Sequence, residues 1–216
     1  MGSEEGPPPG GVRIDVAEVD ARWAAAWRPE RVARRLEGIA APWYVAAGWA
    51  LDLFLGGQSR PHDDLEIAVP AGEFAELRSR FPELEFDAVG WGRTWPAAGP
   101  AALAATRQTW ARDPANGQYR FDVFREPHED GRWICRRDES LRLPYPEVIE
   151  RTADGIPHLR PELALLFKAK AVRDKDRADF ERVLPRLGPD RRAALAAWLR
   201  RAHPGHEWLE RLERLG

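Results

Sequence analysis

The sequence has a single cysteine and no long apolar run, and each shortage excludes a class of protein. Cys135 has no second cysteine to pair with, and no Cys/His cluster has zinc-binding spacing, so neither a disulfide scaffold nor a structural zinc module is supported. The longest uncharged stretch, residues 40–51, is shorter than the roughly 20 residues that span a bilayer. A cytoplasmic protein without a membrane partner is therefore expected.

An excess of one charge is also missing, because 33 basic and 35 acidic residues give a formal net charge of −2. This balance argues against binding nucleic acid by general electrostatic attraction. Lysine occurs only at Lys168, Lys170 and Lys175, so arginine supplies 30 of the 33 basic residues. An ammonium group suits phosphate oxygens, so the lysine cluster is a candidate phosphate-binding segment; a solvated helix face is the alternative interpretation.

Hydrophobic periodicity predicts an α/β (α+β) protein with a mixed sheet flanked by helices and a helical C-terminal lobe. Residues 1–12 are expected to form a disordered lead-in, 13–145 the sheet domain and 146–216 the helical domain. Strands are predicted at 43–47, 65–69, 84–89, 118–124 and 131–135, and helices at 19–27, 29–36, 49–55, 71–81, 161–170, 174–184, 189–201 and 206–212. Residues 90–116 carry only a weak signal for short strands around a loop.

Three acidic residues lie in the predicted strands. Because side chains alternate along a strand, Asp64 and Glu66 project from one face while Leu65 and Ile67 fill the other. Asp122 lies between aromatic residues in a later strand. If the two strands are neighbours, the three carboxylates converge and require a hard cation such as Mg²⁺ among them, as in a phosphoryl-transfer site. The alternative is a set of solvent-facing acids on a half-exposed sheet.

Four segments together resemble a known signature. They are GWALDLFLG at 48–56, RPHDDLEI at 60–67, FDVF at 121–124, and PELALLFKAK with RDKDRADF at 161–170 and 173–180. This set resembles the nucleotidyltransferases of the DNA polymerase beta superfamily, most closely the aminoglycoside 2''-nucleotidyltransferases and the lincosamide nucleotidyltransferases. The resemblance covers residues 43–180 and implies the nucleotidyltransferase fold. Two departures are a single glycine after Ala47, where the family usually has Gly-Gly or Gly-Ser, and Glu66 in place of aspartate.

The resemblance also implies roles for single residues. Asp64, Glu66 and Asp122 are the implied Mg²⁺ ligands and catalytic residues, with Asp122 also accepting the proton of the attacking hydroxyl. The implied nucleotide-binding residues are Gly48 and Trp49 at the start of a helix, then Arg60, His62, Lys168 and Lys170. Lys168 and Lys170 diverge by about 200° on one helix, which favours Lys168. For His62, contact with phosphate, orientation of Asp64 and a surface ion pair all stay open.

The resulting prediction is a Mg²⁺-dependent nucleotidyltransferase that moves a nucleoside monophosphate from an NTP, ATP by preference, to a hydroxyl of an aminoglycoside- or lincosamide-like small molecule, releasing pyrophosphate. Glu126, Glu129 and Asp130 could bind a cationic acceptor. The alternatives are a toxin that modifies tRNA or protein, using Arg132, Arg136, Arg137 and Arg142, and a non-catalytic nucleotide-binding protein. Asp52 is expected to have a structural role, and Asp174, Asp176 and Asp179 are expected to form ion pairs on a helix surface. A homodimer is compatible with the sequence.

Overall fold

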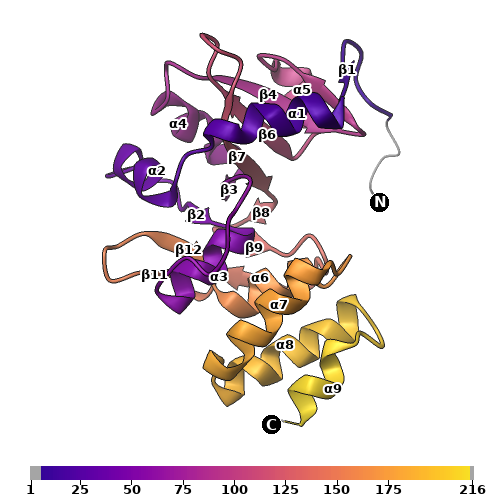
Figure 1. Ribbon diagram of the computed structural model, residues 1–216. Helices are drawn as coiled ribbons and strands as arrows, with labels where there is room; N and C mark the ends of the chain where they lie inside the picture. The colour runs from indigo at the N-terminus through magenta and orange to yellow at the C-terminus, as the bar shows by residue number, and fades with distance from the viewer. Residues whose placement is uncertain (1–5, 215–216) are drawn as a thin grey trace. The chain divides into compact units, whose positions relative to one another are not determined.

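The computed structural model describes residues 6–214, which fall into two compact units (Figure 1). Unit 1 comprises Met1–Trp43 and Asp63–Glu126, and unit 2 comprises Tyr44–His62 and Pro127–Gly216. This division differs from the predicted boundary at residue 145. The reason is that the helix after residue 46 packs against the C-terminal helices, a contact between distant segments that local periodicity does not reveal.

Unit 1 is a six-stranded arrangement with four short helices. Its strands follow the order β1-β5-β4-β6-β7-β3, in which β3 is parallel to β7 and the other pairs are antiparallel. Their bounds are β1 Val12–Arg13, β3 Glu66–Pro70, β4 Glu85–Gly90, β5 Arg93–Trp95, β6 Gln108–Arg112 and β7 Tyr119–Glu126. The helices are α1 Val16–Arg22, α2 Pro29–Arg35, α4 Phe74–Ser79 and α5 Pro100–Ala105, with 3-10 turns at Trp23–Ala25 and Ala71–Glu73.

The two faces of the sheet in unit 1 have different coverings. On one face Phe121 packs against Phe81 and Phe86, with ring centroids 4.9 and 6.3 Å away, and α5 adds Ala102 beside Ala88. On the other face Trp23 packs against Trp110 and Tyr119. This aromatic packing fixes the sheet and therefore the positions of the polar residues in β3 and β7.

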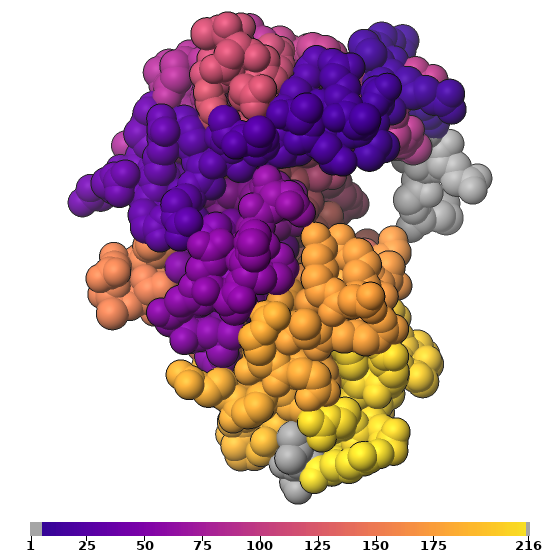
Figure 2. All heavy atoms as spheres, viewed as in Figure 1, coloured from indigo at the N-terminus to yellow at the C-terminus, as the bar shows by residue number. Residues whose placement is uncertain are grey.

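Unit 2 combines short strands with helices. It contains β2 Tyr44–Val45, α3 Ala47–Leu55, β8 His128–Glu129, β9 Arg132–Ile134, β10 Arg142–Pro144, β11 Ile149–Arg151 and β12 Pro157–Leu159, with a 3-10 turn at Tyr145–Glu147. The helices α6 Pro161–Lys168, α7 Asp174–Val183, α8 Pro189–Ala202 and α9 Trp208–Glu213 follow, with a 3-10 turn at Leu184–Arg186. The strands form two groups, β2-β12-β11 and β10-β9-β8. In the space-filling view the C-terminal helices α8 and α9, coloured toward yellow, lie side by side (Figure 2).

Local signals explain where several elements start and end. Pro29, Pro161 and Pro189 occupy the first helical turn, where a missing N–H costs nothing. Gly56 ends α3 with a φ of 84°, which glycine adopts without steric cost. Asp15 caps α1 by accepting a hydrogen bond from the Glu18 amide at 3.2 Å. None of the described helices is long and apolar enough to cross a membrane.

Three expectations from the sequence are corrected. Residues beyond 146 are not all helical, because β11 and β12 pair antiparallel before α6 begins. The segment 90–116 contains the expected short strands, β5 and β6, but also the helix α5, which was not expected and whose Gly99-Pro100 start is a helix signal. The lead-in, residues 1–12, was expected to be disordered. Its described part, from Gly6 onward, contacts β5, where the Trp95 indole N–H donates to the carbonyls of Pro8 and Pro9. Residues 1–5 lie outside the described part.

Candidate functional site

Glu66 and Asp122 lie next to each other in unit 1. Strands β3 and β7 are parallel and pair Glu66 with Asp122, and the Asp122 amide donates to the Leu65 carbonyl at 2.7 Å. Residues paired in register point to the same face, about 4.8 Å apart across the strands. Asp64 precedes Glu66 by two residues, just before β3 begins. The structure therefore brings the predicted strands of the acidic residues together as neighbours.

Asp122 is the most enclosed of the three acids, with 2% of its surface exposed, whereas Asp64 and Glu66 are partly exposed. Gln108 on β6 donates a hydrogen bond from Nε2 to Asp122 Oδ2 at 2.5 Å. Trp110, two residues further along β6, is paired directly with Asp122. The carboxylate of Asp122 is thus held in one orientation by a neighbouring strand. Gln108 is not a predicted site residue, because periodicity does not show that β6 and β7 are neighbours.

The donor chemistry of these acids fits a hard divalent cation, since carboxylate oxygens are the ligands that Mg²⁺ prefers. Within residues 6–214, no three acidic, histidine or cysteine side chains lie close enough together to coordinate a metal ion as they stand. Carboxylates on one face repel one another unless a cation lies among them. The residues fit Mg²⁺ by type and by strand position, and the ligand set itself stays a proposal.

The start of α3, in unit 2, has an unusual backbone. Ala46 precedes the helix and makes no side-chain hydrogen bond to its first turn, and the Ala46 carbonyl accepts from the Ala50 amide at 3.2 Å. Ala47 has a φ of 48°, in the left-handed region where glycine is favoured. A Cβ on Gly48 would lie 2.6 Å from Arg60 Nη2 and 2.7 Å from a His62 ring carbon. Gly48 therefore permits the close approach of Arg60 and His62 to the first turn of α3.

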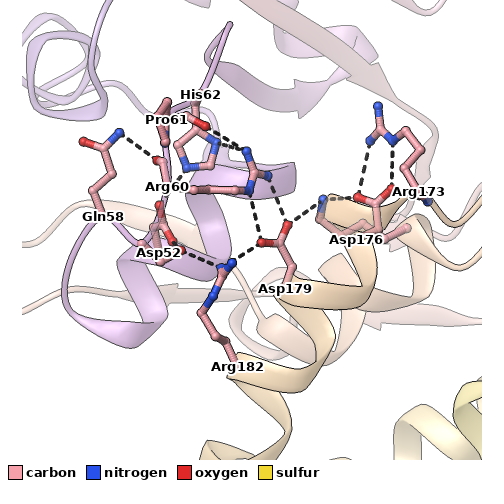
Figure 3. Close-up of polar contacts among 11 residues, drawn as sticks. Asp52, Gln58, Arg60, Pro61, His62, Arg173, Asp176, Asp179 and Arg182 are labelled. Atoms are coloured by element: carbon pink, nitrogen blue, oxygen red, sulfur yellow. Dashed lines mark hydrogen bonds and ion pairs between the residues drawn. The ribbon is translucent and has the colours of Figure 1, made fainter.

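A network of buried charges surrounds this turn (Figure 3). Arg60 donates to Asp179 from Nε at 3.1 Å and from Nη2 at 3.0 Å. Lys168 Nζ lies 3.1 Å from Asp179 Oδ2, the oxygen that accepts from Arg60 Nη2, and 2.7 Å from Asp176 Oδ1. Arg182 donates to Asp179 Oδ1 at 3.1 Å. Asp179 thus joins Arg60 of the loop after α3 to Lys168 at the end of α6.

The electrostatics of the network follow from its pairing. Burial alone would raise the pKa of Asp179, but hydrogen bonds from Arg60 and the charge of Lys168 hold it below the ordinary value. Burial likewise opposes ionisation of Asp176, yet Arg173 and Lys168 lower its pKa. Burial acts to lower the pKa of Arg60, but Asp179 outweighs it and the pKa rises. The pairing therefore favours the charged forms of Asp176, Asp179 and Arg60.

This network corrects the prediction that Asp176 and Asp179 form ion pairs on a helix surface. Their side chains are only 1% and 3% exposed, and they face Lys168 and Arg60. By contrast, the side chain of Asp174 is fully exposed and pairs with Arg177 as expected. The sequence did contain a signal for this pairing. Asp176 and Asp179 share one face of a helix, and the lysine cluster of a chain with only three lysines lies close to them in the sequence.

His62 lies inside the network and not in a surface ion pair. Its Nε2 is 2.7 Å from Asp52 Oδ2, and its Nδ1 is 3.1 Å from Arg60 Nη1. The Trp49 ring stacks on the imidazole, with centroids 4.5 Å apart and planes at 28°. Burial lowers the pKa of His62, and the charge of Arg60 adds to this against the opposing effect of Asp52. Asp52 is buried, in agreement with a structural role.

Other predicted residues lie elsewhere. Lys170 follows the end of α6 and is exposed, and its charge contributes to lowering the pKa of His203, after the larger effect of burial. Trp95 and Trp110 are buried in the core of unit 1, and Trp91 is about half exposed. The suggested acceptor acids are divided between units: Glu126 ends β7, whereas Glu129 and Asp130 belong to unit 2, where Glu129 pairs with Arg142. Arg136 and Arg137 lie over the Phe167 ring.

Comparison with known proteins finds similarity to antibiotic-modifying nucleotidyltransferases. Residues 30–91, which include α3 and β3, match the family model of aminoglycoside-2''-adenylyltransferase. The chain has the nucleotidyltransferase fold. A crystal structure of the lincosamide antibiotic adenylyltransferase LnuA bound to lincomycin is similar with a TM-score of 0.50 and 17% identity, covering 70% of this chain and 91% of that one. Among curated proteins, no sequence matches the chain significantly.

Two structures of the antibiotic-resistance factor ANT(2'')-Ia are also similar. Its solution structure has a TM-score of 0.53 and 15% identity, covering 94% of this chain and 100% of that one. Its crystal structure in complex with adenylyl-2''-tobramycin has a TM-score of 0.53 and 14% identity, covering 80% and 95%. The predicted resemblance and fold class are confirmed, and the nucleotidyltransferases found agree with the predicted enzyme class.

Proposed function

We propose that this nucleotidyltransferase-fold protein is a Mg²⁺-dependent enzyme that moves a nucleoside monophosphate from a nucleoside triphosphate to a hydroxyl of a small antibiotic. The in-register pairing of Glu66 with Asp122, with Asp64 two residues before Glu66, carries the proposal. Solvent-facing acids alone do not explain Asp122, which is 2% exposed and hydrogen-bonded to Gln108. The family match over residues 30–91 supports the same class of reaction.

Asp64, Glu66 and Asp122 would hold Mg²⁺, which when bound neutralises phosphate charge and polarises the phosphoryl group. Asp122 accepts the proton of the acceptor hydroxyl. The hydroxyl oxygen then forms a bond to the α-phosphorus, the bond from that phosphorus to the oxygen bridging to the β-phosphorus breaks, and pyrophosphate leaves with the electron pair. Gln108 keeps the Asp122 carboxylate in a fixed orientation during proton transfer.

The triphosphate is bound by residues of unit 2 in this proposal. The start of α3 carries the positive end of the helix dipole, which suits phosphate oxygens. Gly48 lets Arg60 approach the first turn of α3 closely, and Arg60 and Lys168 supply positive charge. The proposal thus assigns the metal-binding acids to unit 1 and the phosphate-binding groups to unit 2.

The donor and the acceptor are inferred from chemistry and from the comparisons. ATP is the proposed donor, because the matched family and the neighbours are adenylyltransferases. The acceptor is an aminoglycoside- or lincosamide-like hydroxyl compound, since LnuA was crystallised with lincomycin and ANT(2'')-Ia with adenylyl-tobramycin. Glu126 supports a cationic acceptor, because it shares the face of Asp122 at the period-two spacing of β7.

Calorimetry with ATP or GTP, with and without Mg²⁺, tests the nucleotide and metal requirements. The wild type and the Asp63→Ala control, an exposed acid next to Asp64, should bind ATP in a Mg²⁺-dependent manner, and Asp64→Ala should not. Mass spectrometry of a panel of antibiotics after incubation should then find added adenylate mass. Metal-independent binding without transfer would favour a non-catalytic binding protein, and adenylate on tRNA or protein would favour a toxin.

A further inference from the structure

The hydrogen bonds of His62 fix the protonation of its ring. Arginine nitrogens only donate hydrogen bonds, so Arg60 Nη1, 3.1 Å from His62 Nδ1, must donate to an unprotonated nitrogen. The proton of neutral imidazole then lies on Nε2, which donates to Asp52 Oδ2 at 2.7 Å. Both ring nitrogens are therefore occupied by protein partners, one as acceptor and one as donor.

The surroundings of Asp52 immobilise this arrangement. Asp52 Oδ1 accepts a hydrogen bond from Ser59 Oγ at 2.5 Å, and Ser59 accepts one from Arg182 at 2.8 Å. Trp49 covers a face of the imidazole, and the His62 side chain is only 5% exposed. The ring cannot rotate toward a ligand without breaking at least two hydrogen bonds.

Arg60 is oriented by the same contacts. Its guanidinium has five N–H donors. Four are engaged: Nε and one Nη2 hydrogen with Asp179, and the two Nη1 hydrogens with His62 and the Pro61 carbonyl. Among the described residues, the fifth, on Nη2, has no hydrogen-bond partner. Nη2 is also the atom that a Cβ on Gly48 would approach to 2.6 Å, at the start of α3.

We propose that His62, oriented by Asp52, is a positioning residue that aims the remaining donor of Arg60 at the phosphate chain of the nucleotide. His62 then contacts Arg60 and not the nucleotide. This inference rests on the proposed function, because it takes the start of α3 as the triphosphate site. It separates His62 from the direct phosphate contact that the sequence left open.

Two substitutions of His62 separate its two hydrogen bonds. Asparagine places an amide oxygen where His62 Nδ1 lies and so keeps an acceptor for Arg60. Glutamine extends its amide to the position of Nε2 and so keeps a donor for Asp52 but offers Arg60 no acceptor. Calorimetry should give a dissociation constant for Mg²⁺-ATP within about threefold of wild type in His62→Asn and about tenfold weaker in His62→Gln, the loss of one charge-assisted hydrogen bond. Equal losses in the two variants would overturn the proposal.

A double-mutant cycle tests whether His62 acts through Arg60. If it does, His62→Gln should weaken Mg²⁺-ATP binding in the wild type but add less than about twofold in an Arg60→Met background, because the group it positions is gone. Affinity for AMP, which lacks the outer phosphates, should change little in every variant. Additive losses, or a loss of AMP affinity, would indicate direct contact between His62 and the nucleotide and contradict the proposal.

NMR spectroscopy tests the assignment on the wild-type protein, so it does not depend on whether a variant folds. The ¹⁵N NMR spectrum of wild-type protein should show a neutral His62 ring with the proton on Nε2, whereas a proton on Nδ1 would refute the assignment. Failure of the proposed function appears differently, as a wild type that binds no Mg²⁺-ATP. Failure of this inference appears as normal wild-type binding with equal or additive losses in the variants.

Discussion

Gln108 on β6 donates its side-chain N–H to Asp122 on β7, the acid that lies beside Glu66. The contact crosses from one strand to its neighbour and holds a buried carboxylate on the sheet face that also carries Trp110. Orientation of this carboxylate is what a proton acceptor requires, because proton transfer depends on geometry first.

Gln108→Leu should therefore lower the transfer rate about 10- to 100-fold with little change in KM for ATP, since a hydrogen bond to a charged group contributes about 1.5–3 kcal/mol. Thr109→Val is the matched control. Thr109 lies next to Gln108 on β6 but points to the opposite face, and its hydroxyl donates to the Val123 carbonyl on β7. Losing this hydrogen bond should cost about 1 kcal/mol of stability without slowing transfer. Steady-state kinetics of both variants decide; a wild-type rate in Gln108→Leu would remove Gln108 from the site.

The backbone of Ala47 predicts a stabilising substitution. Its φ of 48° destabilises the folded state by about 1–2 kcal/mol for any residue with a Cβ, and glycine avoids this strain. Glycine is also more flexible in the unfolded chain, which reduces the gain by about 0.4–1 kcal/mol. Ala47→Gly should raise the free energy of unfolding by about 0.5–1 kcal/mol. The same change at Ala50, in the interior of α3, should lower it by about 1 kcal/mol. Urea unfolding of both variants measures the difference, and destabilisation by Ala47→Gly would contradict the backbone assignment.

The three lysines should differ in function. Lys168 shares Asp179 with Arg60, so Lys168→Met should weaken Mg²⁺-ATP binding about 10- to 100-fold, the equivalent of one charge-assisted hydrogen bond. Lys170→Met should change the affinity less than about threefold, because Lys170 lies beyond the end of α6. Lys175→Met, on exposed α7 surface, is the control. Equal losses at positions 168 and 170, measured by calorimetry, would show that the network is not the phosphate site.

Acid should weaken the charged network of unit 2. The pKa of Asp176 is lowered in the folded protein, so its stabilising contribution is complete above the unfolded value of about 3.9 and is lost as pH falls through the folded value. Asp176→Asn should lower the free energy of unfolding at pH 7 by about 3 kcal/mol, because Lys168 loses a buried partner. The deficit relative to wild type should shrink below pH 4.

Urea unfolding at pH 7, 5 and 3 measures this dependence. Asp174→Asn is the control on the same helix, because the Asp174 side chain is fully exposed in its pair with Arg177. It should change stability by less than about 0.5 kcal/mol at every pH. A deficit in Asp176→Asn that does not vary with pH would show that packing and not charge accounts for the effect.

The sequence determined much of the local structure. Alternation predicted the strands of Glu66 and Asp122, and proline and glycine signals predicted the ends of α2 and α3. It could not predict β11 and β12, because three-residue strands are too short to show a period. It also could not show that α3 joins the C-terminal helices, since that packing depends on contacts between distant segments.

For the candidate site, the sequence by itself determined which side chains can bind metal and phosphate, because charge and donor type belong to the residue. Only the tertiary structure decided which of them meet. The register of β3 against β7 places Glu66 beside Asp122, and the packing of α7 brings Asp179 to Arg60, 119 residues earlier in the chain. Burial then made Asp176 and Asp179 internal partners of Arg60 and Lys168 instead of surface charges, because buried ions persist only when paired.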